Sequence, residues 1–94
     1  MADAILSEIL EDIHALATEL QTYESKYGVL SETFFEAYMG GEEPDDDVWV
    51  PDFAIWAGTY QTWLDRQREY RAAVRRLREH PASLSQLIRV AAPA

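Results

Sequence analysis

The residues best suited to chemistry lie in one acidic stretch, GGEEPDDDVWVPDF, at positions 40–53, which holds six acids, two glycines, two prolines and one tryptophan. Closely spaced carboxylates are ligands that Ca²⁺ and Mg²⁺ prefer. A calcium-binding EF-hand loop that begins at Asp45 needs glycine at its sixth position and glutamate at its twelfth, but these positions hold Val50 and Trp56. The sequence therefore predicts no specific metal site, and at most a weak contact with a hydrated cation. The run is typical of a solvated loop beside a helix N-terminus, where the helix dipole favours negative charge.

The other reactive side chains do not form a catalytic pattern. The two histidines, His14 and His80, are far apart in the sequence, and the chain has no cysteine. There is no Ser-His-Asp arrangement and no HExxH spacing, and Gly40 and Gly41 are followed by acids, which repel phosphate. Carboxylates are abundant, but no apolar cleft is visible in the pattern to raise the pKa of one of them. We therefore predict a protein that is not an enzyme and uses no cofactor.

Six arginines lie in the long segment after the acidic stretch, which is expected to form a helix: Arg66, Arg68, Arg71, Arg75, Arg76 and Arg78. At helical spacing they form a basic stripe, which raises the question of nucleic-acid binding. The whole chain has a formal net charge of −9, however, and phosphate binding scales with local positive charge. No helix-turn-helix or ribbon-helix-helix pattern surrounds the stripe. We interpret the arginines as partners of an acidic N-terminal helix and predict no direct contact with nucleic acid.

Aromatic residues are concentrated at the end of the acidic stretch and in the helix that follows it. We expect Trp56, Tyr60 and Trp63 to pack against the aromatic residues of a short preceding helix. Trp49 is different, because it follows three consecutive aspartates. It either plugs the end of the helical core or serves as an anchor for a partner, since an aromatic residue ringed by acids is typical of a binding hot spot. The predicted partner-binding residues are Asp45, Asp46, Asp47, Trp49, Phe53 and Trp56.

Two long amphipathic helices must position these residues. The first is expected over about residues 3–27, with apolar residues at alternating spacings of three and four and with Gly28 as its stop. The seam of this helix is Leu6, Ile9, Ile13, Leu16, Leu20, Tyr23 and Tyr27. The second long helix is expected from about Asp52, its predicted N-cap, to Glu79, before Pro81. Its seam is Phe53, Trp56, Tyr60, Trp63, Gln67, Tyr70, Val74 and Leu77.

Shorter elements complete the prediction. Ser31 is expected to cap a short helix that ends at Gly40 and Gly41. SLSQ, at positions 83–86, is a capping box that opens one or two further helical turns, and the last five residues are expected to be frayed. The predicted fold is all-α: an antiparallel hairpin of two long helices with the short helix across one end. The seams can also pair between two chains, which would give a dimeric helical bundle.

Composition sets the class of protein. The chain has 94 residues, of which 48% are hydrophobic, which suits one domain. We predict a helical domain over residues 1–80 and a short helical turn with a frayed tail over 81–94. The acidic N-terminus does not resemble a signal peptide, and no apolar run is long enough to span a membrane. Together with the lack of cysteine, this predicts a cytoplasmic protein without membrane contact.

The charge is divided unevenly along the chain. Residues 1–52 hold 14 acids and one base, whereas residues 53–94 hold three acids and seven bases, so the two parts carry about −13 and +4. Opposite charges favour the folding of one part onto the other. The remaining negative charge predicts a basic partner.

Two segments, YESKYGVLSETFFEAYMGGEEPDDD and FAIWAGTYQTW, resemble a group of short bacterial helical proteins. The group shares a YG-xx-S-E-x-F turn, a connector of glycine and acids, and a W-A-x-x-Y helix, and the resemblance covers about residues 20–65. Its members are similar to antitoxins that are encoded beside a small, often basic toxin. This chain has a longer acidic connector than the group. The matching residues are Tyr27, Gly28, Ser31, Glu32, Phe34, Gly41, Trp56 and Tyr60.

The resemblance implies an antitoxin that neutralises a small basic toxin of the nuclease type by covering its active surface. The carboxylates of Asp45, Asp46 and Asp47 would take the place of RNA phosphates, and Trp49 would be the buried anchor. The main alternative is a self-associating helical bundle with a structural role and no toxin partner, whose acidic loop only keeps it soluble. An adaptor that docks another basic protein would use the same surface as the antitoxin.

Overall fold

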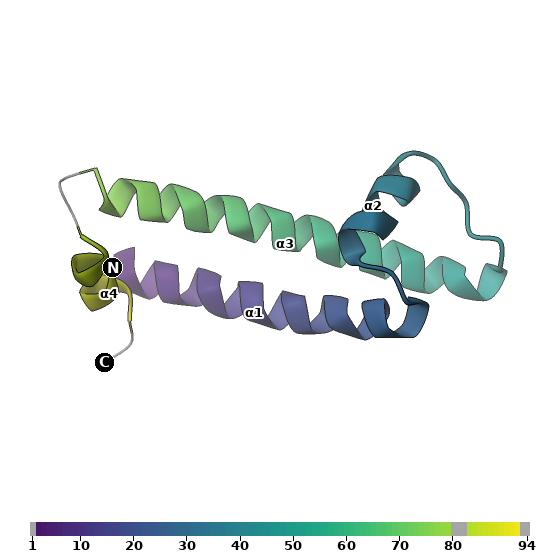
Figure 1. The fold of residues 1–94 in the computed structure, drawn as a ribbon, viewed down its shortest axis with the longest axis horizontal. Coiled ribbons are helices and arrows are strands. Elements are labelled where there is room, and N and C mark those ends of the chain that lie inside the picture. Colours follow the sequence, from purple (N-terminus) through teal and green to yellow (C-terminus); the bar gives the residue numbers. More distant parts are fainter. Residues whose placement is uncertain (1, 80–82, 93–94) are drawn as a thin grey trace.

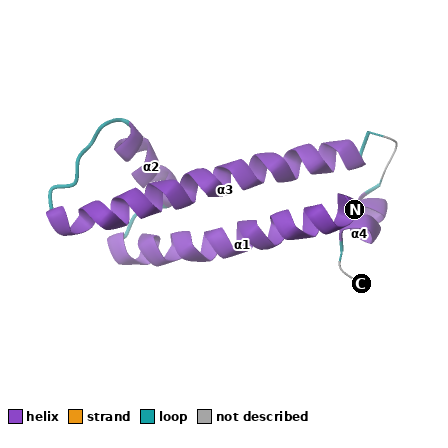
Figure 2. Cartoon of the chain, turned by 180° about the vertical axis from the view of Figure 1, so that it is seen from behind, coloured by secondary structure: helices purple, strands orange, loops and turns teal. Residues whose placement is uncertain are grey.

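Two long helices run antiparallel along the molecule and form a hairpin (Figure 1). The computed structural model describes residues 2–79 and 83–92. In it, α1 (Ala2–Tyr27) packs along α3 (Val50–Leu77), and the molecule measures 52 × 25 × 20 Å. Only helices and loops occur in these ranges (Figure 2). The all-α hairpin predicted from the sequence is therefore confirmed.

The apolar seams of the two long helices face each other within one chain. Leu6, Ile9 and Leu20 of α1 are buried, and the seam positions between them are half-buried. The buried residues of α3 are Trp56, Ala57, Tyr60 and Ala73. The two alanines lie outside the predicted seam. Because a methyl group is short, alanine lets the two backbones approach closely, and Ala57 belongs to the same buried cluster as Trp56.

The short helix α2 (Ser31–Met39) lies across α3 at the end where α1 turns (Figure 1). Gly28 makes the turn with a φ of +76°, a conformation that glycine adopts without strain. The prediction that Ser31 caps α2 is wrong, because the N-cap is Leu30, which has no capping side chain. Glu24 of α1 satisfies this helix end instead, and its Oε2 accepts a hydrogen bond from the Ser31 backbone N–H at 2.9 Å.

The acidic connector is shorter than predicted. A single 3-10 turn, η1 (Asp47–Trp49), leads directly into α3, which begins at Val50 instead of Asp52. Asp46 caps η1, since its Oδ1 accepts a hydrogen bond from the Val48 N–H at 2.9 Å. Pro51 is tolerated because the first turn of a helix has no internal partner for its N–H. Asp52 therefore lies within the first turn, and its predicted role as the N-cap is wrong.

The C-terminal helix α4 (Leu84–Ala91) packs against α1 near the start of the chain (Figure 1). It opens with the predicted capping box, in which Ser83 and Gln86 bond each other's backbone N–H groups. The last five residues were predicted to be frayed, but helical structure continues to Ala91. The predicted domain boundary at residues 80 and 81 and the last two residues lie outside the described ranges.

Candidate partner-binding site

A buried chain of hydrogen bonds joins the three helices at one point. The Trp56 indole Nε1–H donates to Ser31 Oγ at 2.9 Å, and the Ser31 hydroxyl donates to Glu24 Oε2 at 2.8 Å. Trp56 has no exposed surface, and Ser31 is 2% exposed. The Glu24 carboxylate also lies at the N-terminus of α2, where the helix dipole favours negative charge. Ser31 therefore links α1 and α3 through its side chain while it begins α2.

Aromatic rings surround this point from all three helices. Phe34 of α2 is stacked on the Trp56 indole, with ring centroids 3.8 Å apart and planes within 1° of parallel. From α1, Tyr23 and Tyr27 are also stacked with Trp56, at centroid distances of 5.7 and 5.6 Å. The predicted packing of Trp56, Tyr60 and Trp63 against the aromatic residues of the short helix is confirmed for Trp56 and Tyr60, since Phe35 and Tyr60 have centroids 4.9 Å apart. Trp63 is stacked with Tyr60 of its own helix, at a centroid distance of 5.6 Å. The aromatic residues close this end of the hairpin.

The start of α3 is tied to the end of α1 by a charged cluster. Asp52 Oδ2 accepts hydrogen bonds from Lys26 Nζ at 2.6 Å and from the Tyr27 hydroxyl at 2.7 Å. Both hydrogen bonds lower the pKa of Asp52 below its usual 3.8, and the bond from Lys26 has the larger effect. The hydrogen bond to Asp52 in turn raises the pKa of Lys26 above 10.5 and that of Tyr27 above 10.0. Near neutral pH the Asp52 carboxyl group is therefore ionised, whereas Lys26 and Tyr27 keep the protons that they donate to it.

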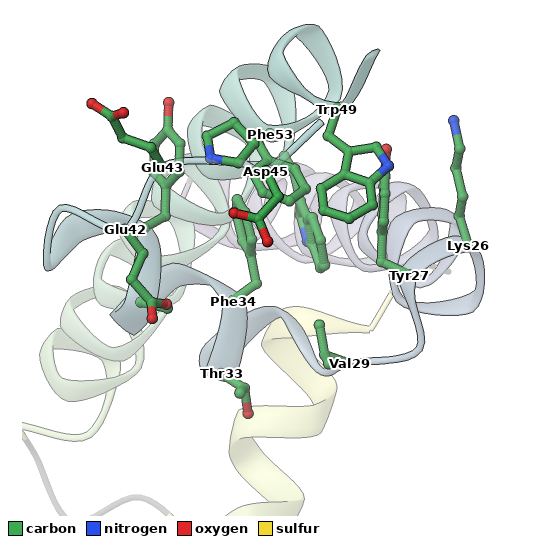
Figure 3. A pocket seen from close by; sticks show the side chains of 14 residues that line it. Lys26, Tyr27, Val29, Thr33, Phe34, Glu42, Glu43, Asp45, Trp49 and Phe53 are labelled. Carbon is green, nitrogen blue, oxygen red and sulfur yellow. The ribbon is translucent and has the colours of Figure 1, made fainter. Parts of the chain in front are cut away.

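A cleft of about 790 Å³ opens between the α1–α2 turn, α2, the connector and the start of α3. Figure 3 shows its lining, with aromatic rings at its base and the connector along one side. The volume lies in the range of ligand sites, roughly 300–1,000 Å³. The lining residues are Lys26, Tyr27, Val29, Thr33, Phe34, Ala37, Tyr38, Glu42, Glu43, Pro44, Asp45, Trp49, Phe53 and Trp56.

Trp49 lies at the edge of the aromatic cluster and also faces the cleft. Its ring packs against Phe53 at a centroid distance of 5.9 Å and edge-on against Tyr27 at 6.1 Å. A fraction of 37% of the residue remains exposed. The side chain thus has features of both predicted roles, because it covers the end of the core with one part and presents the other to solvent.

The three aspartates of the connector separate in the structure. Asp45 lines the cleft, and its side chain points into it in Figure 3. Asp46 is the cap of η1, and Asp47 lines a smaller neighbouring hollow with Val50 and Phe53. The run was predicted to act as one charged patch, but only Asp45 shares the cleft with Trp49. The turn at η1 causes this separation.

The two remaining predicted site residues differ in exposure. Phe53 is half-buried beside Trp49, whereas Trp56 is fully buried and forms the base of the cleft. Trp56 therefore has no surface for direct contact with a partner and supports the rings above it. Sequence reasoning missed the other ten lining residues, among them Tyr27 and the carboxylates of Glu42 and Glu43. The antiparallel hairpin was itself a clue to Tyr27, because the end of the first helix must lie opposite the start of the other long helix.

Large exposed apolar side chains gather at the cleft end. Seven of the eleven described by the structure fall within residues 29–55, and they include Val48, Val50 and Ile55 at 77%, 48% and 57% exposure. Surfaces of this kind mark interaction sites more often than scattered apolar residues do. The structure thus leaves many large apolar side chains exposed, of which Val29 and Trp49 line the cleft itself, and such side chains suggest a surface for a partner.

The arginines of α3 meet the acids of α1 less than predicted. Arg66 Nε bonds Asp12 Oδ2 at 3.1 Å across the two helices, but Arg68 pairs with Asp65 of its own helix. In the described ranges, no three or more His, Cys, Asp or Glu side chains come together in a group that could hold a metal ion. Among the same residues, no helix is both long and apolar enough to cross a bilayer.

Comparison of the chain with protein-family models, curated proteins and solved structures found no significant match in any of the three.

Proposed function

We propose that this protein is a binding module for a basic protein and that it acts as the antitoxin of a small nuclease-type toxin. The observation that supports this proposal most is the cleft, whose aromatic base lies beside the carboxylates of Glu42, Glu43 and Asp45. Aromatic anchors at the centre of an interface supply much of its affinity. Complementary charge around them sets the rate and selectivity of association.

The charge of this region suits a toxin that binds RNA. Residues 24–52 hold nine acids and one base, Lys26, and that base is bonded to Asp52. A surface that binds RNA phosphates is basic, so carboxylates at the cleft end can occupy it in place of phosphates. A partner covered in this way cannot contact its substrate.

The test is neutralisation of growth arrest. Each reading frame that neighbours this gene is expressed alone and together with this chain, and colony counts are compared. We expect growth arrest when a neighbouring frame is expressed alone, and relief of this arrest when this chain is expressed with it. Trp49→Ala should abolish the relief, whereas Leu84→Ala, which truncates a residue 65% exposed on α4, should preserve it. The absence of arrest by any neighbouring frame, or equal relief by both variants, would contradict the proposal.

The alternative of a self-associating bundle is favoured by one observation. Leu84 and Ile88, on the same face of α4, are 65% and 52% exposed, although Leu87 and Ala91 of this helix are half-buried. A second copy could cover this face. Light scattering decides between the two functions, because self-association through α4 predicts a dimer that Ile88→Glu converts to a monomer.

A further inference from the structure

The cleft combines an acidic wall with aromatic faces, and this combination recognises cations. Its carboxylates come from the connector, and in Figure 3 that of Asp45 points into the cleft whereas that of Glu43 points away. Across from this wall lies the one basic side chain of the lining, Lys26, whose charge is already bonded to Asp52. The cleft therefore has a negative potential, which repels phosphates and attracts cationic groups.

The rim of the cleft already holds one cation by this chemistry. Lys26 Nζ lies 5.5 Å from the centroid of the Tyr27 ring and 2.6 Å from Asp52 Oδ2. Ring faces attract cations through their quadrupole, and the attraction is strongest for tryptophan. Trp49 and Asp45 present the same pair of groups inside the cleft. Among the described side chains, no ion pair involves Asp45, so these two groups are available to a cation from outside.

We propose that the cleft binds an arginine of a basic protein segment, with its guanidinium on the exposed part of the Trp49 ring and Asp45 as its counter-charge. The inference rests on the proposed function and names the part of the partner that enters the site. Arginine fits better than lysine because its planar guanidinium stacks on aromatic rings, is weakly hydrated and donates paired hydrogen bonds to a carboxylate. The cleft is larger than one side chain, so flanking residues of the segment can enter with it.

The indole N–H resonances of the ¹⁵N-labelled protein provide the test. The chain has three tryptophans, so a two-dimensional spectrum separates signals that overlap in fluorescence. The probe is a short peptide of alanine and glycine that carries arginines, and its control has citrulline, a neutral isostere of arginine, at the same positions. We expect the Trp49 signal, assigned with Trp49→Phe, to move on titration. The Trp56 signal should stay, because its N–H is buried and bonded to Ser31.

Charge specificity separates the proposal from simple apolar binding. The citrulline peptide should bind at least about tenfold more weakly, because it keeps the shape but loses the charge-assisted hydrogen bonds. Equal shifts with both peptides would overturn the proposal. The proposal would also be overturned if tetramethylammonium saturated the Trp49 shift at the same concentration as the arginine peptide does. The site would then recognise small organic cations in general.

Two neighbouring aspartates supply a matched pair of variants. Asp45→Asn and Asp46→Asn remove the same charge one residue apart, but only Asp45 lines the cleft, and asparagine caps as well as aspartate. We expect Asp45→Asn to weaken the arginine peptide about tenfold and Asp46→Asn less than about threefold. An equal effect would mean that only the overall charge matters and would overturn the local contact. If Asp45→Asn also dissolved a dimer seen for the parent protein, the occupant would be a second copy, which contradicts the proposal.

Failure of this inference differs from failure of the proposed function. If Asp45→Asn and Trp49→Phe neutralise the toxin as well as the parent chain does, the antitoxin function stands and the arginine site is wrong. If the arginine peptide binds as expected but no toxin is neutralised, the cleft retains its specificity and the antitoxin function is wrong.

Discussion

Phe34 and Trp56 lie with their rings stacked, their centroids 3.8 Å apart, although the two residues come from different helices separated by the acidic connector. Phe34 is 6% exposed and Trp56 has no exposed surface. The pair holds α2 on α3 and fixes the floor of the cleft. Its removal should therefore affect both the stability of the fold and the shape of the site.

Phe34→Ala should lower the free energy of unfolding by about 3–5 kcal/mol, the usual cost of deleting a large buried aromatic side chain. Urea denaturation followed by circular dichroism measures this loss. Met39→Ala is the control on the same helix, because Met39 is 65% exposed and should change stability by less than about 0.5 kcal/mol. A similar small loss for Phe34→Ala would mean that α2 does not depend on the aromatic stack.

Ser31→Ala tests the hydrogen-bond chain between the helices. It leaves the buried Trp56 indole N–H without its acceptor and removes one of the two bonds to Glu24. A buried polar group without a partner costs about 1–3 kcal/mol, and we expect a loss of this size in urea denaturation. Ser25→Ala, at an exposed position of α1, should have almost no effect. An equal effect of the two substitutions would show that the Ser31 hydroxyl is not needed.

Asp52→Asn should make stability less dependent on pH. The lowered pKa of Asp52 means that its contribution is complete above the unfolded pKa near 3.8 and is lost as the pH falls through the lower folded value. The raised pKa values of Tyr27 and Lys26 mean that their contributions are present below about pH 10 and are lost as the pH rises through the folded values.

We therefore expect Asp52→Asn to lower Tm between these limits and the difference from the parent protein to shrink at either extreme. Differential scanning calorimetry across the pH range measures this. Asp47→Asn is the control, because Asp47 is exposed at the start of η1. A constant difference at all pH values would show that the loss does not come from the charged cluster.

Trp49→Ala should cost less stability than Phe34→Ala, because 37% of Trp49 is exposed. We expect about 1–2 kcal/mol from the apolar surface that it covers. Binding to a partner that uses the cleft should weaken by about 2 kcal/mol or more, as at other aromatic hot spots. Thermal unfolding and titration calorimetry measure the two effects separately. A stability loss as large as that of Phe34→Ala, with binding unchanged, would make Trp49 a plug of the core.

Much of the fold followed from periodicity alone. The alternating spacing in the two long helices predicted their faces, and Gly28 and the Ser83 capping box marked where the chain turns and restarts. The errors were at helix starts. Ser31 has the ideal residue type for an N-cap, but it lies one position inside α2 because Glu24 of another helix supplies the acceptor. A contact of this kind depends on tertiary packing and leaves no local signal.

The candidate site was predicted only in part. Trp49 and Asp45 could be selected because an aromatic residue beside acids is unusual in a loop. The different positions of the three aspartates could not be predicted, since they depend on the turn at η1. One lines the cleft, one caps η1 and one lines the neighbouring hollow. Side-chain burial at Trp56 was equally invisible, because its helical spacing fits both a core residue and a contact residue.

Because the chain folds as a hairpin, the uneven distribution of charge along its sequence gathers negative charge at one end of an elongated molecule. Residues 24–52 carry nine acids and one base, so about −8 of the total charge of −9 sits at the cleft end of a molecule 52 Å long. At the opposite end, the arginines of α3 lie beside the first turns of α1 and nearly balance their acids. Such a molecule has a large electric dipole along its axis and experiences a torque near a cationic surface. It should turn its cleft toward that surface before contact, so that most encounters begin end-on.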